Sequence, residues 1–412
     1  MRIAMFTNNY KPYVGGVPVS IERLFNGLRE LGHEVVVFAP DYGVCEAEEN
    51  VVRYKTIYQK KQEGMMIGNC LGSKIEKRFS EGQFDVIHVH HPVISGFAAL
   101  YLGKKYGIPV AYTYHTRYEE YLHYFKFYNA MERHRLGGMA SYMKTVLVPR
   151  YMTAFANSCD LVFAPTEMMK DCLNGYGVRT EIKVLPTGLE DASFVERREA
   201  SEEIRTRMKG ENSFLFCTVS RLEKEKNLEF LLRGVAEVKK RIGNSFRLMV
   251  IGEGSEQERL RCLASELGIG ENLVFTGKVP NERIRDYLFA SDLFLFASKS
   301  ETQGIVLLEA MAAGTPVVAV KAVGVMDIVQ NGMNGYMTEE DEEAWAGAVE
   351  KIVRHQAYFC EMKQNSVKTA SAYQSLKIAA AAVRGYREMS ERHRTNKITD
   401  ILRKAVWDLP YA

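Results

Sequence analysis

Several patterns that would place a chain in a specialised class are missing from this sequence. Its seven cysteines have no Cys-x-x-Cys spacing, so they suggest neither a zinc site nor a disulfide framework and are typical of reduced thiols. No apolar run approaches the about 20 residues that a membrane-spanning helix needs. A Gly-x-Gly-x-x-Gly fingerprint and an Asp-x-Asp pair are also absent. The net charge of +3 gives no reason to expect nucleic acid as a partner.

The composition that is present is that of an ordinary globular enzyme. The chain has 412 residues, of which 46% are apolar and 25% charged, and this length allows two or three domains. The N-terminal residues Met1–Phe6 have a strand pattern rather than the pattern of a signal peptide. We therefore expect a cytoplasmic protein.

Short apolar segments alternate with amphipathic helical segments, such as Val19–Leu31, along the whole chain. This alternation predicts βαβ units with parallel sheets, which is an α/β fold. The order restarts after about residue 190, which indicates two domains of similar size. The predicted strands are Arg2–Phe6, Glu34–Ala39, Asp85–Val89, Pro109–Tyr114, Leu161–Ala164 and Lys183–Leu185 in the first half, and Phe214–Val219, Arg247–Ile251, Leu273–Phe275, Leu293–Phe296, Pro316–Val320 and Gly335–Met337 in the second.

The expected linker is Pro186–Asp191, which a charged run follows at Val195–Arg207. We therefore assign residues 1–188 to a first domain and residues 189–384 to a second. The tail has a helical composition with many charges. We expect a helix over about residues 385–412 that returns to the first domain.

The most informative stretch is Glu301–Pro316, in which two carboxylates, Glu301 and Glu309, stand eight positions apart. The second carboxylate opens a run of helix formers, and Gly314–Pro316 closes it, so the stretch predicts a loop, a helix, a turn and a buried strand. Glu301 follows a predicted strand, at the edge where open parallel sheets bind ligands. A carboxylate there suits sugar hydroxyls, and one near the helix could hold a ribose.

Two cationic side chains follow the first strand of the second domain. Arg221 can grip phosphate oxygens with two hydrogen bonds, and Lys226 adds a point charge nearby. A solvated charge run is the commoner explanation of such a segment, but its place after a strand favours a functional one. Gly252, in the loop Ile251–Gly254 after the next strand, is a weaker signal of the same kind.

Gly15 and Gly16 follow the first strand and precede a helix. Paired glycines let the backbone approach a ligand and aim amides at it, although a tight turn is an equally good explanation. His115 directly follows the predicted strand Pro109–Tyr114. It could hydrogen-bond a sugar hydroxyl or offer its backbone carbonyl to developing positive charge, although a lone histidine is more often structural.

Aromatic and basic residues are interleaved between Arg117 and Tyr151. From Arg117 to Arg150, six Lys and Arg residues stand against three acids. Such a face suits an anionic membrane surface. A helical pair that packs its aromatics into the domain is the alternative, and it is slightly favoured.

The residues singled out above resemble, in type and order, the retaining glycosyltransferases of family four. The resemblance covers most of the chain and implies the GT-B fold, in which two Rossmann-like domains with parallel sheets face a central cleft. The segment from His115 and the segment Ser300–Gly304 look most like bacterial glucosyltransferases that act on diacylglycerol, although Gln303 stands where many members carry Phe. The residues that carry the resemblance are Gly15, Gly16, His115, Arg221, Lys226, Glu301 and Glu309.

The resemblance also implies roles for individual residues. Arg221 and Lys226 would bind the diphosphate of a nucleotide-sugar, and Glu301 would hold hydroxyls of the donor sugar. The residues expected in catalysis are His115, Arg221, Lys226 and Glu301. Those expected at the donor are Gly16, Gly252, Gln303, Gly304, Ile305 and Glu309, with Glu309 on the ribose. Those expected on the acceptor side are Gly15, Arg117 and Tyr118.

The reaction implied is transfer of a hexose, with UDP-glucose as the favoured donor, to an acceptor hydroxyl with retention of configuration. Two cations and helix N-termini can stabilise the leaving diphosphate, so we expect no metal and no other cofactor. The expected acceptor is a lipid such as diacylglycerol, or a small molecule, and the enzyme would contact the inner face of the plasma membrane peripherally. A soluble sugar or polyol acceptor, a nucleotide-sugar 2-epimerase and a nucleotide-sugar binding module remain as alternatives.

Overall fold

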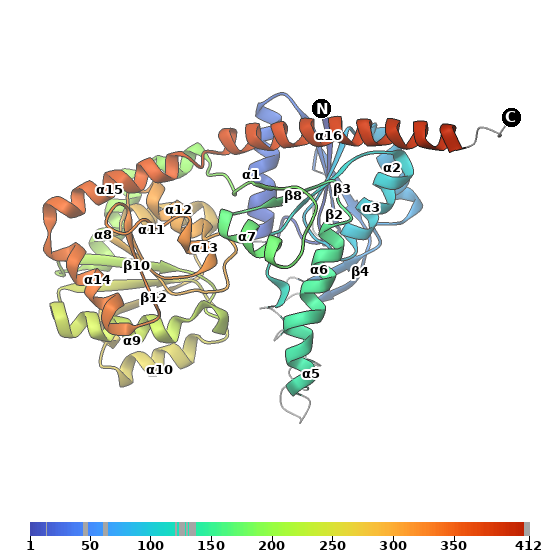
Figure 1. Cartoon of the computed structure of the whole chain (residues 1–412). Helices are drawn as coiled ribbons and strands as arrows, with labels where there is room; N and C mark the ends of the chain where they lie inside the picture. Colours follow the sequence, from blue (N-terminus) through green and yellow to red (C-terminus); the bar gives the residue numbers. More distant parts are fainter. Residues whose placement is uncertain are drawn as a thin grey trace. The chain divides into compact units, whose positions relative to one another are not determined.

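The computed structural model describes residues 1–13, 15–43, 48–60, 65–119, 122, 128, 131 and 137–407. The chain forms two compact units, each of which is described here by itself (Figure 1). The first unit is Met1–Gly188 together with the chain from Ser375 onward, and the second is Leu189–Gln374. The predicted α/β class with two parallel sheets is confirmed.

In the described part of the first unit, seven parallel strands form one sheet in the order β3-β2-β1-β6-β7-β8-β9. The strands are β1 (Arg2–Phe6), β2 (Glu34–Pro40), β3 (Val51–Tyr54), β6 (Val86–Val89), β7 (Val110–Thr113), β8 (Leu161–Ala164) and β9 (Ile182–Val184), and a separate antiparallel hairpin consists of β4 (Thr56–Lys60) and β5 (Met65–Gly68). The helices are α1 (Gly16–Glu30), α2 (Ser73–Gly82), α3 (Ser95–Tyr106), α5 (Gly137–Tyr142), the π-helix η3 (Met143–Leu147), α6 (Val148–Ala156), α7 (Glu167–Gly175) and α16 (Ser375–Trp407).

The described second unit holds a six-stranded parallel sheet in the order β12-β11-β10-β13-β14-β15. Its strands are β10 (Phe214–Val219), β11 (Phe246–Ile251), β12 (Leu273–Gly277), β13 (Leu293–Phe296), β14 (Val317–Val320) and β15 (Gly335–Thr338). Its helices are η4 (Asp191–Phe194), α8 (Arg198–Lys209), η5 (Lys224–Lys226), α9 (Leu228–Ile242), α10 (Gln257–Glu266), η6 (Gly270–Asn272), α11 (Asn281–Phe289), α12 (Ile305–Ala312), α13 (Val323–Met326), α14 (Glu342–Arg354) and α15 (Gln356–Ser371).

Each sheet is covered by helices on both faces, so its strands are apolar at successive positions rather than at alternate ones. In β10, for example, Phe216 packs into the core on one face of the sheet, whereas Leu215 and Cys217 pack into the core on the other. The buried Trp345 of α14 belongs to the same core as Phe216. The two cores of the second sheet hold its strands between them, which fixes where their ends lie.

The strand order reverses once in each sheet, between β1 and β6 in the first unit and between β10 and β13 in the second. In an open parallel sheet, the loops at such a reversal splay apart at the carboxyl ends of the strands and form a ligand site. The loops in question begin at Thr7 and His90 in the first unit and at Ser220 and Ala297 in the second. These four loops are therefore the places to look for function.

The long helix α16 belongs to the first unit from its first residue. A Cβ atom built on Gly27 of α1 would lie 2.9 Å from the Cβ of Ala379, which shows how closely the two helices pack. Residues 375–384 were assigned to the second domain from the sequence. They lie in the first unit because this packing begins with the first turns of α16.

Two details of the predicted secondary structure are corrected. Strand β3 and the β4–β5 hairpin were not predicted, because Val51–Tyr54 is a short edge strand that is only partly buried and has no clear alternation. Helix α12 begins at Ile305, and not at the run of helix formers that Glu309 opens. Ile305 and Val306 are β-branched and favour helix weakly, but the Gly304 amide donates to the carbonyl of Gly324 at 2.9 Å, and this contact sets the start of the helix.

Candidate active site

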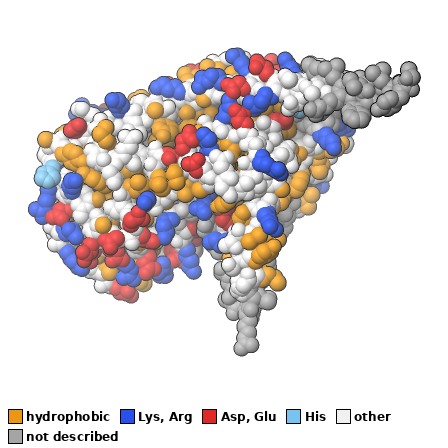
Figure 2. All heavy atoms as spheres, viewed as in Figure 1, with side chains coloured by type: hydrophobic (Ala, Val, Ile, Leu, Met, Phe, Trp, Pro, Cys, Tyr) orange, Lys and Arg blue, Asp and Glu red, His pale blue; other side chains and the backbone are white. Residues whose placement is uncertain are grey.

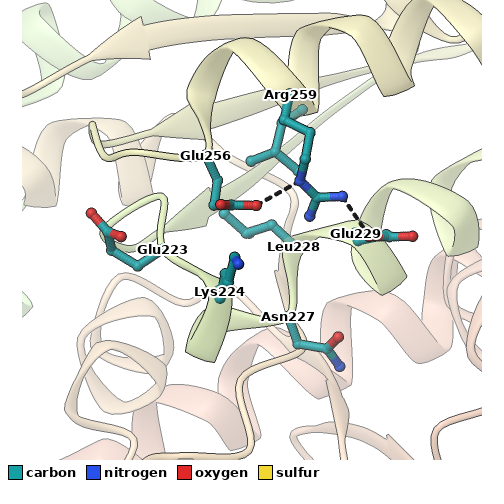
Figure 3. Close-up of a pocket in the computed structure, with 8 residues that line it drawn as sticks. Glu223, Lys224, Asn227, Leu228, Glu229, Glu256 and Arg259 are labelled. Atoms are coloured by element: carbon teal, nitrogen blue, oxygen red, sulfur yellow. Dashed lines mark hydrogen bonds and ion pairs between the residues drawn. The ribbon is translucent and has the colours of Figure 1, made fainter. Parts of the chain in front are cut away.

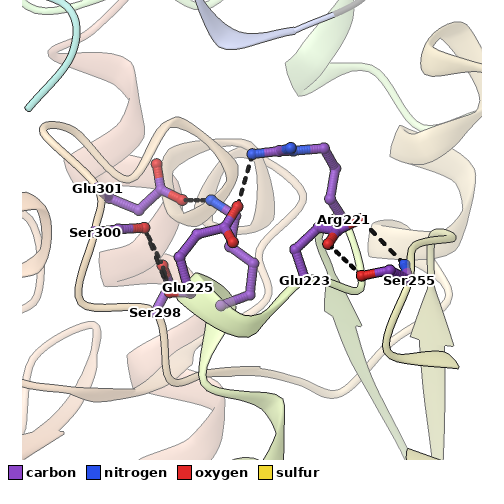
Figure 4. Close-up of polar contacts among 8 residues, drawn as sticks. Arg221, Glu223, Glu225, Ser255, Ser298, Ser300 and Glu301 are labelled. Atoms are coloured by element: carbon purple, nitrogen blue, oxygen red, sulfur yellow. Dashed lines mark hydrogen bonds and ion pairs between the residues drawn. The ribbon is translucent and has the colours of Figure 1, made fainter. Parts of the chain in front are cut away.

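The central contact of the second unit joins the two loops at the strand-order reversal. Lys226 lies at the end of η5, in the loop after β10, and its Nζ donates to Oε1 of Glu301 in the loop after β13 at 2.5 Å. Figure 4 labels Glu301 and draws this contact as a dashed line. The Lys226 side chain is only 10% exposed, whereas that of Glu301 is 26% exposed. The ammonium is therefore held at the base of the site, where the two loops meet.

Arg221, five positions before Lys226, makes a second ion pair in the same loop. Its Nη2 lies 2.8 Å from Oε1 of Glu225, and the guanidinium side chain is 52% exposed (Figure 4). The backbone carbonyl of Glu225 accepts hydrogen bonds from the hydroxyls of Ser298 at 3.5 Å and Ser300 at 3.4 Å. We call the segment Arg221–Lys226 the cationic loop. The two serines tie it to the end of β13, so it has a defined place beside Glu301.

Sequence reasoning did not identify Ser298 and Ser300. Both are buried, and their hydroxyls lie 3.2 Å apart. The available signal was the pair of small hydroxyl residues directly after a buried strand, just before Glu301. Alone, that signal is weak because serines are common in loops.

The glycine loop after β11 packs against the same cationic loop. Gly252 has a φ of 133°, and a Cβ atom there would lie 1.9 Å from the carbonyl oxygen of Ser220, so no other residue fits. The carboxylate of Glu223 accepts from both the amide of Ser255, at 3.1 Å, and its hydroxyl, at 2.6 Å (Figure 4). The two loops thus support one another at the carboxyl edge of the sheet.

The start of α12 lies next to Glu301. Cβ atoms built on Gly304 and Gly324 would come within 2.6 Å of Leu307 and 2.7 Å of the Glu301 carbonyl, respectively, so both glycines allow a close approach of loop and helix. Gln303 is buried in this loop, and Glu309 lies half-buried one turn into the helix. A helix N-terminus carries partial positive charge, which adds to that of Lys226.

Gly15 and Gly16 lie where the sequence predicts, at the start of α1 after β1. The φ of Gly15 is 180°, which is extended backbone that any residue adopts. A Cβ atom on Gly16 would meet no described atom within 4 Å. The conformation therefore does not require glycine at these two positions, and open space lies above Gly16.

His115 lies at the carboxyl end of β7, close to a second histidine from the neighbouring strand. Its Nε2 is 2.9 Å from Nδ1 of His90, which follows β6, and the two rings stack with their centroids 5.2 Å apart. Burial lowers the pKa of His115 and that of His90 well below the usual histidine value, and positive charge on neighbouring histidines would lower both further. The pair is therefore neutral at physiological pH.

Two further histidines complete this cluster. His88 Nδ1 lies 2.7 Å from the hydroxyl of Tyr386 in α16, and its Nε2 lies 2.6 Å from the hydroxyl of Thr113. His91 Nδ1 lies 3.1 Å from the hydroxyl of Thr7, at the end of β1. Sequence reasoning singled out His115 alone and missed His88, His90 and His91, although three of the nine histidines fall within the four positions 88–91, at the end of a predicted strand.

Arg117 and Tyr118, predicted on the acceptor side, lie just after His115. Nε of Arg117 lies 3.1 Å from Oε1 of Glu119, a buried carboxylate that also accepts from the hydroxyl of Tyr176 at 3.4 Å. Burial raises the pKa of Tyr118, so its phenol is neutral. The interleaved aromatic and basic segment falls partly outside the described residues, namely at positions 120, 121, 123–127, 129, 130 and 132–136.

A pocket of about 520 Å³ in the second unit lies beside the cationic loop (Figure 3). Within it, Arg259 is paired with Glu256 at 2.6 Å and with Glu229 at 2.7 Å. None of the residues predicted at the active site lines this pocket. Its lining is Glu223, Lys224, Asn227, Leu228, Glu229, Glu256, Arg259 and Leu260.

The structure thus brings the predicted residues together as two groups. In the second unit, Arg221, Lys226, Glu301 and the Gly252 loop meet at one strand-order reversal. In the first unit, His115 joins a histidine cluster on the strands next to the other reversal. Among the described residues, no group of three or more His, Cys, Asp or Glu is arranged to hold a metal ion.

Comparison with known proteins identifies related families for both units. Residues 14–193 match the family Glycosyltransferase Family 4, and residues 200–371 match the family Glycosyl transferases group 1. The chain is 33% identical, over 77% of its length and 71% of the relative's, to an alpha-monoglucosyldiacylglycerol synthase of Streptococcus pneumoniae. It is 29% identical, over 83% of its length and 86% of the relative's, to the synthase of the same name from Acholeplasma laidlawii.

Among solved structures, the chain is similar to HepE from Anabaena, which was crystallised with UDP. The TM-score is 0.73 at 19% identity, and the match covers 94% of this chain and all of the other. At this identity the similarity concerns the fold, which is the GT-B arrangement of two Rossmann-like domains.

The buried histidines predict that the free energy of unfolding falls at acid pH. Replacing one of them should make that fall smaller. Burial lowers the pKa of His91 to about 4 from an ordinary value of 6.5, so the unfolded chain binds the proton first as the pH falls. The contribution of His91 to the free energy of unfolding is therefore nearly constant well above pH 6.5. Stability is lost progressively as the pH falls from about 6.5 to 4. At pH 5.5 the loss from this residue is about 1.4 kcal/mol.

His91→Asn places an amide oxygen where Nδ1 accepts from the Asn8 amide at 3.2 Å. We expect the free energy of unfolding of this variant, measured by urea denaturation at pH 7.5 and pH 5.5, to fall less than that of the unmodified protein. His355→Asn, at an exposed histidine, is the control for histidine removal. An equal fall in the unmodified protein and in His91→Asn would contradict the prediction.

Proposed function

Because the chain belongs to glycosyltransferase family 4 and is a hexosyltransferase of the GT-B fold, we propose that it transfers glucose from UDP-glucose to a hydroxyl of diacylglycerol, with retention of configuration. The observation that carries the proposal is the contact between Lys226 and Glu301, with Arg221 beside it. This contact places a buried cation and a partly exposed carboxylate at one point, as a sugar diphosphate requires.

The donor assignment rests on the charge and the supply of hydrogen-bonding groups at this point. The Arg221 guanidinium carries its N–H groups in a planar fork that suits phosphate oxygens, and its side chain is 52% exposed. The Lys226 ammonium adds a second positive charge, and the Glu301 carboxylate, whose side chain is 26% exposed, can accept from sugar hydroxyls. A nucleoside diphosphate sugar is therefore met by positive charge at its phosphates and by a carboxylate at its sugar. HepE, which shares the fold, has been solved with UDP-glucose.

In the proposed reaction, the bond between the anomeric carbon and the diphosphate oxygen breaks as the acceptor oxygen approaches from the same face. The bonding electron pair leaves with the diphosphate, whose growing negative charge Arg221 and Lys226 stabilise. The acceptor hydroxyl loses its proton to a phosphate oxygen as its own bond to the sugar forms. These two cations and the N-terminus of α12 can supply the stabilisation by themselves, so we propose a transfer that needs no metal.

The acceptor assignment rests on the two alpha-monoglucosyldiacylglycerol synthases, whose names state a lipid product. The first unit also has a surface suited to a lipid acceptor. In α5 and η3 the apolar residues Met139, Tyr142 and Leu147 are exposed, and basic Lys144 and Arg150 lie in the same helical run. Figure 2 shows hydrophobic and basic side chains next to one another over α6.

A second exposed apolar row on α3 adjoins this helical run. Phe97 and Tyr101 are exposed one turn apart on α3, and the ring of Phe97 lies 6.4 Å from that of Tyr151 in α6. Among the described helices, none combines the length and apolar character of a membrane span. We therefore propose that the protein reaches its acceptor by peripheral contact of α3, α5 and α6 with an anionic bilayer, on the cytoplasmic side of the plasma membrane.

The transfer itself can be measured with radiolabelled UDP-glucose and vesicles that contain diacylglycerol. We expect a labelled glycolipid, formed equally well in the presence of EDTA. Parallel reactions with UDP-galactose, UDP-N-acetylglucosamine and GDP-mannose test the donor, and free polyols and sugars test a soluble acceptor. Label found only in a soluble product would contradict the lipid acceptor, and an absence of transfer from every donor would contradict the proposal as a whole.

Removal of either cation should lower the rate of transfer. For Arg221→Ala and Lys226→Ala we expect kcat/KM to fall by about 10²–10³-fold, because each removes a charged contact that strengthens as the diphosphate leaves. Lys224→Ala is the matched control, since this neighbouring lysine lines the separate pocket. Near-normal rates for both variants would rule out this assignment of the diphosphate.

Membrane contact can be tested by flotation with vesicles that contain phosphatidylglycerol. We expect the unmodified protein to float with these vesicles and not with purely zwitterionic ones. The double variant Tyr142→Glu, Leu147→Glu should lose binding, because it places charge on the apolar face of the helix. Val195→Glu changes an exposed apolar residue of the second unit and should bind normally. Equal flotation of all three proteins would show that α5 and η3 do not take part.

A further inference from the structure

The histidine cluster of the first unit suggests a residue that acts on His115 and that sequence reasoning did not identify. On the basis of the function proposed above, we propose that His90 is a positioning residue: its Nδ1–H donates to Nε2 of His115 and thereby fixes the tautomer and ring orientation of His115. The hydrogen of neutral His115 is then on Nδ1, so the ring serves as a hydrogen-bond donor through that nitrogen and not as a base.

The geometry of the pair supports a direct hydrogen bond. The two nitrogens are 2.9 Å apart, and the rings are inclined by only 24°. The two histidines follow neighbouring parallel strands, since β6 pairs with β7 in the register His88 with Ala111 and Val89 with Tyr112. The pairing of the two strands therefore brings His90 and His115 close together.

Both rings are neutral, because burial lowers the pKa of each well below the usual histidine value. A neutral imidazole has one N–H donor and one acceptor nitrogen. Within the pair, therefore, one ring donates and the other accepts, and the direction decides which nitrogen of His115 carries its hydrogen.

The surroundings of His90 favour one direction. Its Nε2 is buried and has no hydrogen-bond partner in the part of the chain that the structure describes. If His90 accepted through Nδ1, its hydrogen would be on Nε2, and a buried N–H group would have no acceptor. Unpaired buried N–H groups are rarer than unpaired acceptors. Donation from Nδ1 of His90 to His115 avoids that state.

His90 is itself held in place from behind. The ring of His88 lies against it, with centroids 4.2 Å apart, and both nitrogens of His88 are engaged by Tyr386 and Thr113. The backbone amide of His90 donates to the carbonyl of Phe6 at 2.9 Å. His90 is thus held by β1 directly, and by β7 and α16 through His88. This support limits the movement of the His90 ring beside His115.

Substitutions at His90 can separate the hydrogen bond from the bulk of the ring. His90→Asn places an amide N–H near the position of Nδ1, whereas His90→Gln carries the same amide one bond further from the backbone. We expect His90→Asn to keep kcat/KM for UDP-glucose within about threefold of the unmodified protein. His90→Gln and His90→Leu should lose about 10–100-fold, by analogy with the loss that follows removal of the partner that orients a metal-bound histidine.

A double-mutant cycle tests whether His90 acts through His115. If it does, His90→Leu combined with His115→Ala should be no slower than His115→Ala alone. Losses that multiply would overturn the proposal, as would equal rates for His90→Asn and His90→Gln. The melting temperature of each variant is measured alongside, so that unfolding is not mistaken for a loss of rate.

The tautomer can also be observed in the unmodified protein, and a variant is needed only to assign the signals. In protein labelled with ¹⁵N-histidine, the ring-nitrogen shifts distinguish protonated from unprotonated nitrogens, and the His115 signals are assigned by comparison with His115→Asn. We expect Nδ1 of His115 to be protonated and Nε2 to be bare. The reverse pattern would overturn the proposal.

This result is independent of the proposed function. If the unmodified protein transferred no glucose from any donor, the function would fail while the nitrogen shifts still decided the tautomer. If the unmodified protein were active and lost activity in Arg221→Ala but not in any His90 variant, the function would stand and the role of His90 would fail.

Discussion

The rest of the candidate site depends on the ion pair between Lys226 and Glu301. These residues are 75 positions apart, and they meet because β10 lies next to β13, where the strand order of the second sheet reverses. The pair joins the loops that follow these two strands, and the serines before Glu301 bind the same cationic loop through the Glu225 carbonyl. A substrate that enters here meets a cation and a carboxylate whose separation is already set, so little ordering is left to occur on binding.

The two units carry different chemistry at corresponding places in their sheets. In the second unit the loops at the reversal are charged, with Arg221 and Lys226 facing carboxylates. In the first unit the end of β6 and the loops after β6 and β7 carry neutral histidines, mostly buried, that are linked to hydroxyls and to one another. Charged groups would suit the diphosphate of the proposed donor, whereas neutral hydrogen-bonding groups would suit the uncharged hydroxyls of the proposed sugar and acceptor.

Much of the fold could be predicted because parallel strands covered on both faces are continuous apolar runs. Strands such as Leu161–Ala164 and Leu293–Phe296 have the predicted bounds for this reason. The edge strand Val51–Tyr54 was missed because it is only partly buried, and its apolar run is short. The start of α12 was placed too late, since a contact between Gly304 and Gly324 outweighs the weak helix preference of Ile305 and Val306.

The sequence by itself determined the alternation of strands and helices, the division into two α/β units and the presence of cations and carboxylates directly after strands. These features are local, because the spacing of apolar residues within a segment indicates whether that segment forms a strand or a helix. Only the tertiary structure decided which of those loops meet. The pairing of Lys226 with Glu301 and of His90 with His115 follows from the order of strands in each sheet. That order depends on how the helices pack across both faces, and no short segment of the chain encodes it.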